Sequence, residues 1–170
     1  MRTFEQACTI QYEEGGNYSV LRDELLAWAP QILREVPGAL KVLPTGSTAI
    51  SGLGKDADYV VKVPDVVVAF DELSAEGWVG NGHGYINTAD FQSMRKGCIN
   101  ILLVQSDAEF RKWEMALDVC LALQDMGVPV TRKVRHKVHR VIRQEDVDLP
   151  YNVLTPDMVK LWELGATRAA

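Results

Sequence analysis

A chain of 170 residues, of which 47% are hydrophobic, is long enough to bury the core of one domain of ordinary size. Its net charge of −5 argues against binding of nucleic acid through the charge of the whole molecule, although a local basic face is compatible with such binding. We find no apolar run of the roughly 18 to 20 residues that a membrane span needs, and no apolar signal-peptide stretch behind Met1, so we expect a cytoplasmic protein without membrane partners.

The N-terminal part of the chain predicts helices. Residues 1–18 show no clear periodicity, and we expect one short helix there that breaks at a pair of glycines. In residues 18–36 apolar side chains recur at helical spacing, which predicts a second helix, ended by the Pro-Gly pair that follows. Pro30 lies inside this segment and is expected to kink or divide the helix.

Strands are expected further along. Residues 39–43 predict a short buried strand, and residues 58–63, which are rich in valine and tyrosine, predict a second one. A short helical turn is expected between them at residues 48–52. Asp65 follows the second strand and is a suitable N-cap for a helix that continues to Glu76.

The next segment predicts a β-hairpin. Residues 78–84 are rich in glycine and are expected to form a turn or loop beside a strand. Residues 91–95 and 98–104 predict two strands joined at Lys96 and Gly97. Helices that alternate with strands, followed by a hairpin, indicate the α+β class with a mixed β-sheet and flanking helices.

The C-terminal part predicts helices again. One is expected to start at Asp107, as its cap, and to end at Gly127. Thr131 is expected to cap a second, strongly basic helix. The tail predicts a last helix at residues 155–164, with a proline in its first turn.

The stretch from Leu43 to Val63 holds the residues with the clearest chemistry. Asp56 and Asp58 are two residues apart, so on an extended chain both carboxylates point to one face. Like charges this close repel each other and either raise a pKa or recruit a cation. Carboxylate oxygens suit Mg²⁺ that is held jointly with substrate phosphates. Gly46 lets backbone N–H groups approach an anion closely, and the Ser47 hydroxyl adds a donor. These residues therefore predict a phosphate cradle beside a metal site.

The order of these residues resembles that of the DNA polymerase β-type nucleotidyltransferase superfamily: a strand, a Gly-Ser turn opening a helix, and a second strand with Asp-x-Asp. Residues 46–53, Gly-Ser-Thr-Ala-Ile-Ser-Gly-Leu, resemble the GrpB-type branch of that superfamily. The resemblance covers roughly residues 42–104. It implies a single nucleotidyltransferase-like domain over residues 1–170, with a core at about 39–104 and a helical C-terminal part at about 107–170.

The resemblance also implies the roles of the motif residues. Gly46 and Ser47 would hold the β- and γ-phosphates of a nucleoside triphosphate. Asp56 and Asp58 would be the catalytic residues and would hold Mg²⁺, with Mn²⁺ as the alternative. The reaction would be transfer of a nucleotidyl group to an acceptor that is a small molecule, a protein or a nucleic acid.

The chain departs from the superfamily pattern in two respects. Only eight residues, 48–55, separate Ser47 from Asp56, which is at or below the short end of the usual spacing. Active members carry a third carboxylate on a later strand, where this chain has Asn100. Asparagine can bind a metal through its carbonyl oxygen but cannot act as a general base. Asp90, on the preceding strand, is a candidate substitute.

Basic residues supply further candidates for nucleotide binding. Lys55 lies beside Asp56 and is interpreted either as a solvated charge or as a ligand of the triphosphate. Arg135, His139 and Arg143 are spaced four residues apart and share one helical stripe. This stripe is interpreted either as a solvated face or as a clamp for nucleotide phosphates or a nucleic-acid strand, because arginine forks match phosphate bidentately.

Two functions of different classes follow. The first is a Mg²⁺-dependent nucleotidyltransferase that uses a nucleoside triphosphate. The second is a catalytically inactive nucleotide-binding or protein-interaction module on the same fold, for example a phage-encoded or toxin-antitoxin type regulator that acts on a host or cognate protein. The missing third carboxylate is the reason for the second hypothesis.

Overall fold

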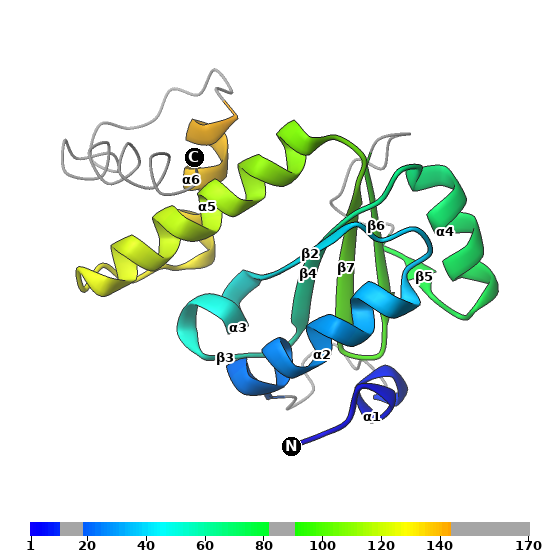
Figure 1. The fold of residues 1–170 in the computed structure, drawn as a ribbon. Helices are drawn as coiled ribbons and strands as arrows, with labels where there is room; N and C mark the ends of the chain where they lie inside the picture. The colour runs from blue at the N-terminus through cyan, green and yellow to red at the C-terminus, as the bar shows by residue number, and fades with distance from the viewer. Residues whose placement is uncertain (11–18, 82–90, 144–170) are drawn as a thin grey trace. The chain divides into compact units, whose positions relative to one another are not determined.

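The computed structural model describes residues 1–10, 19–81 and 91–143 (Figure 1). The chain divides into two compact units, Met1–Phe110 and Arg111–Ala170. All strands of the described residues belong to the first unit. Within the described ranges, no helix combines the length and the apolar character needed to cross a bilayer. The expectation of a single domain over residues 1–170 stays a prediction.

A five-stranded sheet in the order β2-β4-β7-β6-β5 forms the centre of the first unit (Figure 1). Its strands are β2 (Lys41–Thr45), β4 (Ala57–Lys62), β5 (Val79–Gly80), β6 (Phe91–Lys96) and β7 (Ile99–Val104). β4 and β7 are parallel, and the other neighbouring strands are antiparallel. The expected mixed sheet with flanking helices is confirmed. The expected hairpin of β6 and β7 is also confirmed, although its turn lies at Gly97 and Cys98, one residue later than expected.

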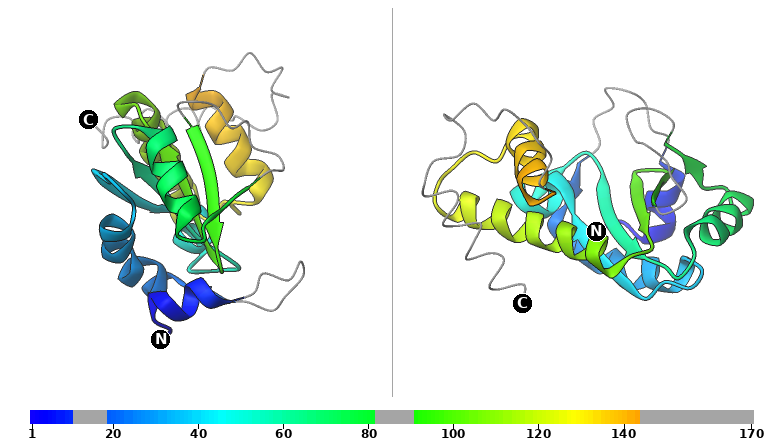
Figure 2. Two further views of the ribbon diagram at one scale, coloured as in Figure 1. Left: turned by 90° about the vertical axis from the view of Figure 1, so that its right-hand side faces the viewer. Right: turned by 90° about the horizontal axis from the view of Figure 1, so that it is seen from above.

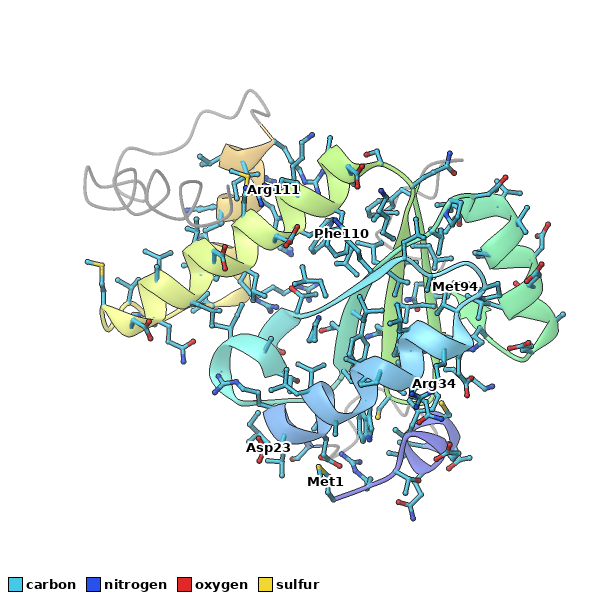
Figure 3. The ribbon with its side chains drawn as sticks, in the orientation of Figure 1. Met1, Asp23, Arg34, Met94, Phe110 and Arg111 are labelled. Carbon is cyan, nitrogen blue, oxygen red and sulfur yellow. The ribbon has the colours of Figure 1, made fainter. Side chains whose placement is uncertain are left out.

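Three helices share one hydrophobic core with this sheet (Figure 2): α1 (Phe4–Thr9), α2 (Arg22–Glu35) and α4 (Val66–Ala75). Along β4, Ala57, Tyr59 and Val61 belong to this core, and Met94 of β6 is fully buried in it (Figure 3). Successive side chains of a strand point to opposite faces of the sheet. Asp58 therefore lies on the face opposite to this core.

Between β2 and β4 the chain forms α3 (Gly46–Ser51) and β3 (Leu53–Gly54), and β3 pairs with β1 (Val20–Leu21). Arg22 donates hydrogen bonds from Nε to the Ala49 carbonyl at 3.0 Å and from Nη2 to the Ile50 carbonyl at 2.9 Å. Carbonyls at the end of a helix have no partner within the helix, so Arg22 satisfies two of them. The start of α2 is thereby joined to the end of α3.

Several boundaries differ from the sequence prediction. The strand expected at residues 39–43 is β2, two residues later, and the expected helical turn begins at Gly46. α2 begins at Arg22 because Val20 and Leu21 pair with β3. Pro30 does not divide α2. Pro30 has no N–H to donate to the carbonyl of Leu26, one turn earlier, and Leu26 is 53% exposed.

The second unit contains most of α5 (Asp107–Asp125), which begins in the first unit, and all of α6 (Arg132–Ile142). Thr131 accepts a hydrogen bond from the Val134 N–H, so its predicted role as a cap is confirmed. The prediction that Asp107 caps α5 is wrong. The Ser106 hydroxyl accepts from the Glu109 N–H and caps the helix, while Asp107 forms an ion pair with Lys62. The helix expected at residues 155–164 lies outside the described residues.

Candidate functional site

Four polar residues are aligned across neighbouring strands of the sheet. Thr45 of β2 is paired with Asp58 of β4, Asp58 with Asn100 of β7, and Asn100 with Arg95 of β6. Directly paired residues on adjacent strands project their side chains from the same face. Thr45, Asp58, Asn100 and Arg95 therefore form one row on the face opposite to the helix-covered core, and we call them the polar row.

The Asp58 carboxylate is held between two neighbours. Asn100 Nδ2 donates a hydrogen bond to Asp58 Oδ1 at 3.0 Å. On the other side lies Gly46, the first residue of α3, with a φ of +79°, and a Cβ on Gly46 would overlap Asp58 Oδ2. Glycine adopts positive φ readily and has no Cβ, so it meets both requirements. The Gly-Ser motif thus brings its backbone directly against the carboxylate.

Asp56 lies just before β4 and has a partly unsatisfied carboxylate. Its Oδ1 is buried and has no hydrogen-bond partner among the described residues. Burial raises the pKa of the Asp56 carboxyl, against the opposing effects of the Arg95 charge, the Asn100 amide and the Lys55 charge. Buried polar atoms in proteins are normally satisfied, and a bound ion or water is a common partner for an atom that the protein itself does not satisfy.

The backbone around Asp56 is fixed by α3. Thr48 is fully buried, and its hydroxyl donates a hydrogen bond to the Asp56 carbonyl at 2.7 Å. A Cβ on Gly54 would overlap the Thr48 hydroxyl and would lie 2.9 Å from Ser47 Oγ. Gly54 therefore lets the segment before Asp56 lie closely against the start of α3. The short spacing between the Gly-Ser turn and Asp56 is accommodated by this close packing.

The structure brings together most of the site residues that the sequence predicts. Gly46 lies directly against Asp58, Asn100 is bonded to Asp58, and the Asn100 amide and the Lys55 charge both act on Asp56. Lys55 is exposed. Asp90 lies outside the described residues, so its candidacy stays a prediction.

The two arginines predicted from the basic helix belong to the second unit. There the Arg143 guanidinium carbon lies 5.7 Å from the centre of the Trp113 ring of α5, and the His139 ring lies 4.3 Å from it. Arg135 is half-buried on the same stripe of α6. This stripe therefore packs against α5, and a role of Arg135 and Arg143 in nucleotide binding stays a prediction.

Arg95 is the residue of this site that the sequence interpretation missed. Its charge lowers the pKa of Asp56, and it is paired with Asn100 across the hairpin. The register of a short hairpin follows from the place of its turn, and the turn expected at Lys96 and Gly97 would have paired Asn100 with Ser93. With the turn at Gly97 and Cys98, the residue opposite Asn100 is Arg95.

The donor set fits a cation that arrives with phosphates. The described part of the chain has no group of three His, Cys, Asp or Glu side chains that could hold a metal ion alone. Mg²⁺ requires less from the protein, because one or two carboxylates suffice when phosphates and water complete its shell. Asp56, with its unpartnered oxygen, and Asp58 provide two carboxylates, and the Asn100 carbonyl oxygen is a further donor.

Comparisons with known proteins give likenesses of fold. No protein-family model matches the chain, and no curated protein matches it in sequence. Among solved structures, it is similar to the crystal structure of the conserved protein GrpB from Enterococcus faecalis, with 17% identity, a TM-score of 0.49, and coverage of 86% of this chain and 90% of that one. It is also similar to a cytoplasmic RNA terminal U-transferase, with 18% identity, a TM-score of 0.38, and coverage of 77% of this chain and 40% of that one.

The first of these structures carries the name of the branch that residues 46–53 resemble. The chain spans less than half of the terminal U-transferase chain. Both likenesses are remote and concern the fold alone. What the site does is therefore inferred from the residues of this chain.

Proposed function

We propose that the chain binds a nucleoside triphosphate together with Mg²⁺, or Mn²⁺, and transfers a nucleotidyl group to an acceptor. The observation that carries the proposal is the position of the Asp58 carboxylate, between the backbone of Gly46 and the amide of Asn100. Asp56, with its buried unpartnered Oδ1, belongs to the same site. A phosphate cradle and a cation site thus share one carboxylate.

The phosphates are assigned to the Gly-Ser turn. Gly46 has no Cβ to keep a phosphate away from the backbone N–H groups of the turn, and the Ser47 hydroxyl is a further donor. Lys55 and Arg95 are cations near the carboxylates and balance the charge of a triphosphate. Mn²⁺ accepts the same oxygen ligands as Mg²⁺, so either ion serves this donor set.

In the proposed reaction a hydroxyl oxygen of the acceptor attacks the α-phosphorus of the nucleotide. The bond from this phosphorus to the oxygen bridging to the β-phosphate breaks, and pyrophosphate leaves with that electron pair. The proton of the acceptor hydroxyl passes to water, because Asn100 cannot take it as a base. When bound, Mg²⁺ would neutralise negative charge on the phosphates. Asp56 and Asp58 hold the ion, and Gly46 and Ser47 orient the phosphates.

A second candidate is an inactive nucleotide-binding module on the same fold, and Asn100 is the observation that favours it. An amide stands where active superfamily members carry a carboxylate, and it donates its N–H to Asp58 rather than adding negative charge. Such a site holds fewer charges for a cation than a three-carboxylate site does. Nucleotide binding without turnover would distinguish this module from the enzyme.

Label transfer from nucleoside triphosphates tests the enzyme directly. The four α-³²P-labelled triphosphates are incubated with the chain, Mg²⁺ or Mn²⁺, and RNA, protein and small-molecule fractions as acceptors. The wild type is expected to label one fraction and to release pyrophosphate, and Asp58→Asn to reduce the rate about a hundredfold or more. Asp71→Asn, the same change on the exposed side of α4, is the matched control and is expected to keep the rate. If wild type and Asp58→Asn give the same background labelling, the proposed nucleotidyltransferase activity is contradicted.

A further inference from the structure

The exposed side of α6 carries a concentration of positive charge in an acidic protein. The residues concerned are Arg132, Lys133, His136, Lys137 and Arg140, which lie together on one side of the helix. We call these five residues the α6 basic stripe. They are spaced so that neighbours four residues apart lie on the same side of the helix. The chain as a whole has a net charge of −5, so this surface is opposite in sign to the molecule that carries it.

Packing among the described residues of the second unit, 111–143, does not account for the α6 basic stripe. Val138 and Ile142 are buried, and Arg143 and His139 contact the Trp113 ring from another side of the helix. In the basic stripe, by contrast, all residues except Lys137 are exposed. The stripe is therefore available to a partner, while the opposite side of α6 forms the contact with α5.

The α6 basic stripe has an energetic cost in the isolated chain. The first turn of α6 contains no acidic residue and begins with Arg132 and Lys133, whose charges oppose the positive end of the helix dipole. Like charges four residues apart destabilise a helix by about 0.2 to 0.5 kcal/mol per pair. Partial burial and then the nearby arginine charges lower the pKa of His136. None of the five residues forms an ion pair with a carboxylate in the described part of the chain.

We infer that the α6 basic stripe binds the phosphodiester backbone of a single strand of nucleic acid. Eight residue steps along a helix rise about 12 Å, so the four Arg and Lys residues of the stripe extend along about 12 Å of one side of the helix. A single strand carries one phosphate on every nucleotide, so successive phosphates can contact several of these side chains at once. A linear run of phosphates is therefore complementary in charge to the linear run of cations on α6.

Other polyanions fit less well. A helix that lies on a membrane needs exposed apolar side chains beside its basic face, and no apolar residue of α6 is exposed. A single phosphate on a peptide would engage one or two of the five side chains and leave the rest without a partner. The inference concerns the second unit and does not depend on nucleotidyl transfer by the first.

Fluorescence anisotropy with a labelled oligouridylate of about 20 nucleotides tests the inference, because each phosphate contact in a single strand adds about 0.7 to the salt slope. Lys133→Gln/Arg140→Gln is expected to raise the Kd about tenfold at low salt and to lower the slope of log Kd against log salt by about 1.4. Glutamine keeps the helix propensity of the residues it replaces, and circular dichroism checks that the variant is folded.

The matched control is Arg34→Gln/Lys41→Gln, which removes two exposed cations of the first unit. Arg34 is labelled in Figure 3. This control variant is expected to leave the Kd within about twofold, as for cations that touch no phosphate. Equal weakening in both double variants would overturn the inference, because it would reflect only the charge of the whole chain. Absence of binding at low salt would also overturn it, and so would binding to phosphatidylserine vesicles with no binding of the oligouridylate.

Discussion

Gly46 illustrates how one residue links the backbone to the chemistry of the site. Its φ of +79° lies in the left-handed region, and its missing Cβ leaves room for Asp58 Oδ2. Gly127 has nearly the same φ, +80°, but a Cβ there would meet nothing within 4 Å. Substitution of Gly127 therefore measures the cost of the backbone conformation alone, whereas substitution of Gly46 adds the cost of a Cβ that overlaps the Asp58 carboxylate.

Gly46→Ala is expected to lower the free energy of unfolding by more than Gly127→Ala. Both variants incur about 1 to 2 kcal/mol for an L-residue at positive φ, and only the first must also displace Asp58. Urea denaturation measures both. Gly46→Ala is also expected to weaken binding of MgATP, while Gly127→Ala is not. If both variants lose the same stability and nucleotide binding is unchanged, Gly46 does not lie in close contact with the Asp58 carboxylate.

At the scale of secondary structure, local signals were predictable and distant contacts were not. Asp65 and Thr131 cap their helices as expected, because capping depends on residues three positions apart. The start of α2 was missed because Val20 and Leu21 pair with β3, a segment far along the chain. Asp107 was misjudged as a cap because its neighbour Ser106 competes for the same role.

The same distinction holds for the site. The motif from Gly46 to Asp58 was visible because its residues are close in sequence. The pairing of Asp58 with Asn100 required the sheet register, which the hydrophobic pattern of the strands indicates only in part. The unpartnered Asp56 Oδ1 could not be predicted, since burial of one atom depends on packing from several elements.

The N-terminal segment is joined to α2 through Glu24, a buried carboxylate. Glu24 accepts hydrogen bonds from the Arg2 backbone N–H and Nε, both at 3.0 Å, and from the Leu21 N–H at 3.1 Å. Burial alone would raise the pKa of Glu24, but the hydrogen bonds from Arg2 and Leu21 outweigh it and lower the pKa from its ordinary value of 4.5. Glu24 thus stabilises the fold in its charged form.

Glu24→Gln is expected to lower the free energy of unfolding at neutral pH by about 2 kcal/mol, because buried hydrogen bonds to a charged group are lost. The stabilisation is complete above pH 4.5, the ordinary pKa, and is lost as the pH falls through the lower pKa of the folded state. The difference in free energy of unfolding between wild type and Glu24→Gln, measured by urea denaturation, should therefore become smaller in acid. Glu72→Gln, an exposed change on α4, is the control. A difference that stays constant down to pH 2 would contradict this account.

At the scale of the whole molecule, the two proposals belong to different units. The first unit holds the sheet, the helix-covered core and the site around Asp58, and the second holds the α6 basic stripe. Nucleotide binding and strand binding are therefore expected to respond to different substitutions. Asp58→Asn should leave oligouridylate binding unchanged, and Lys133→Gln/Arg140→Gln should leave MgATP binding unchanged.

Calorimetric titration with ATP tests the central claim most directly, because it measures the shared cation and phosphate site without needing the acceptor. The wild type is expected to bind ATP in Mg²⁺ and to lose at least about tenfold in affinity when the ion is chelated, since Asp56 and Asp58 repel a bare triphosphate. Asp58→Asn should lose the dependence on Mg²⁺, and Asp71→Asn should keep it. ATP affinity that is the same with and without Mg²⁺, or that Asp58→Asn leaves unchanged, would contradict the proposed site.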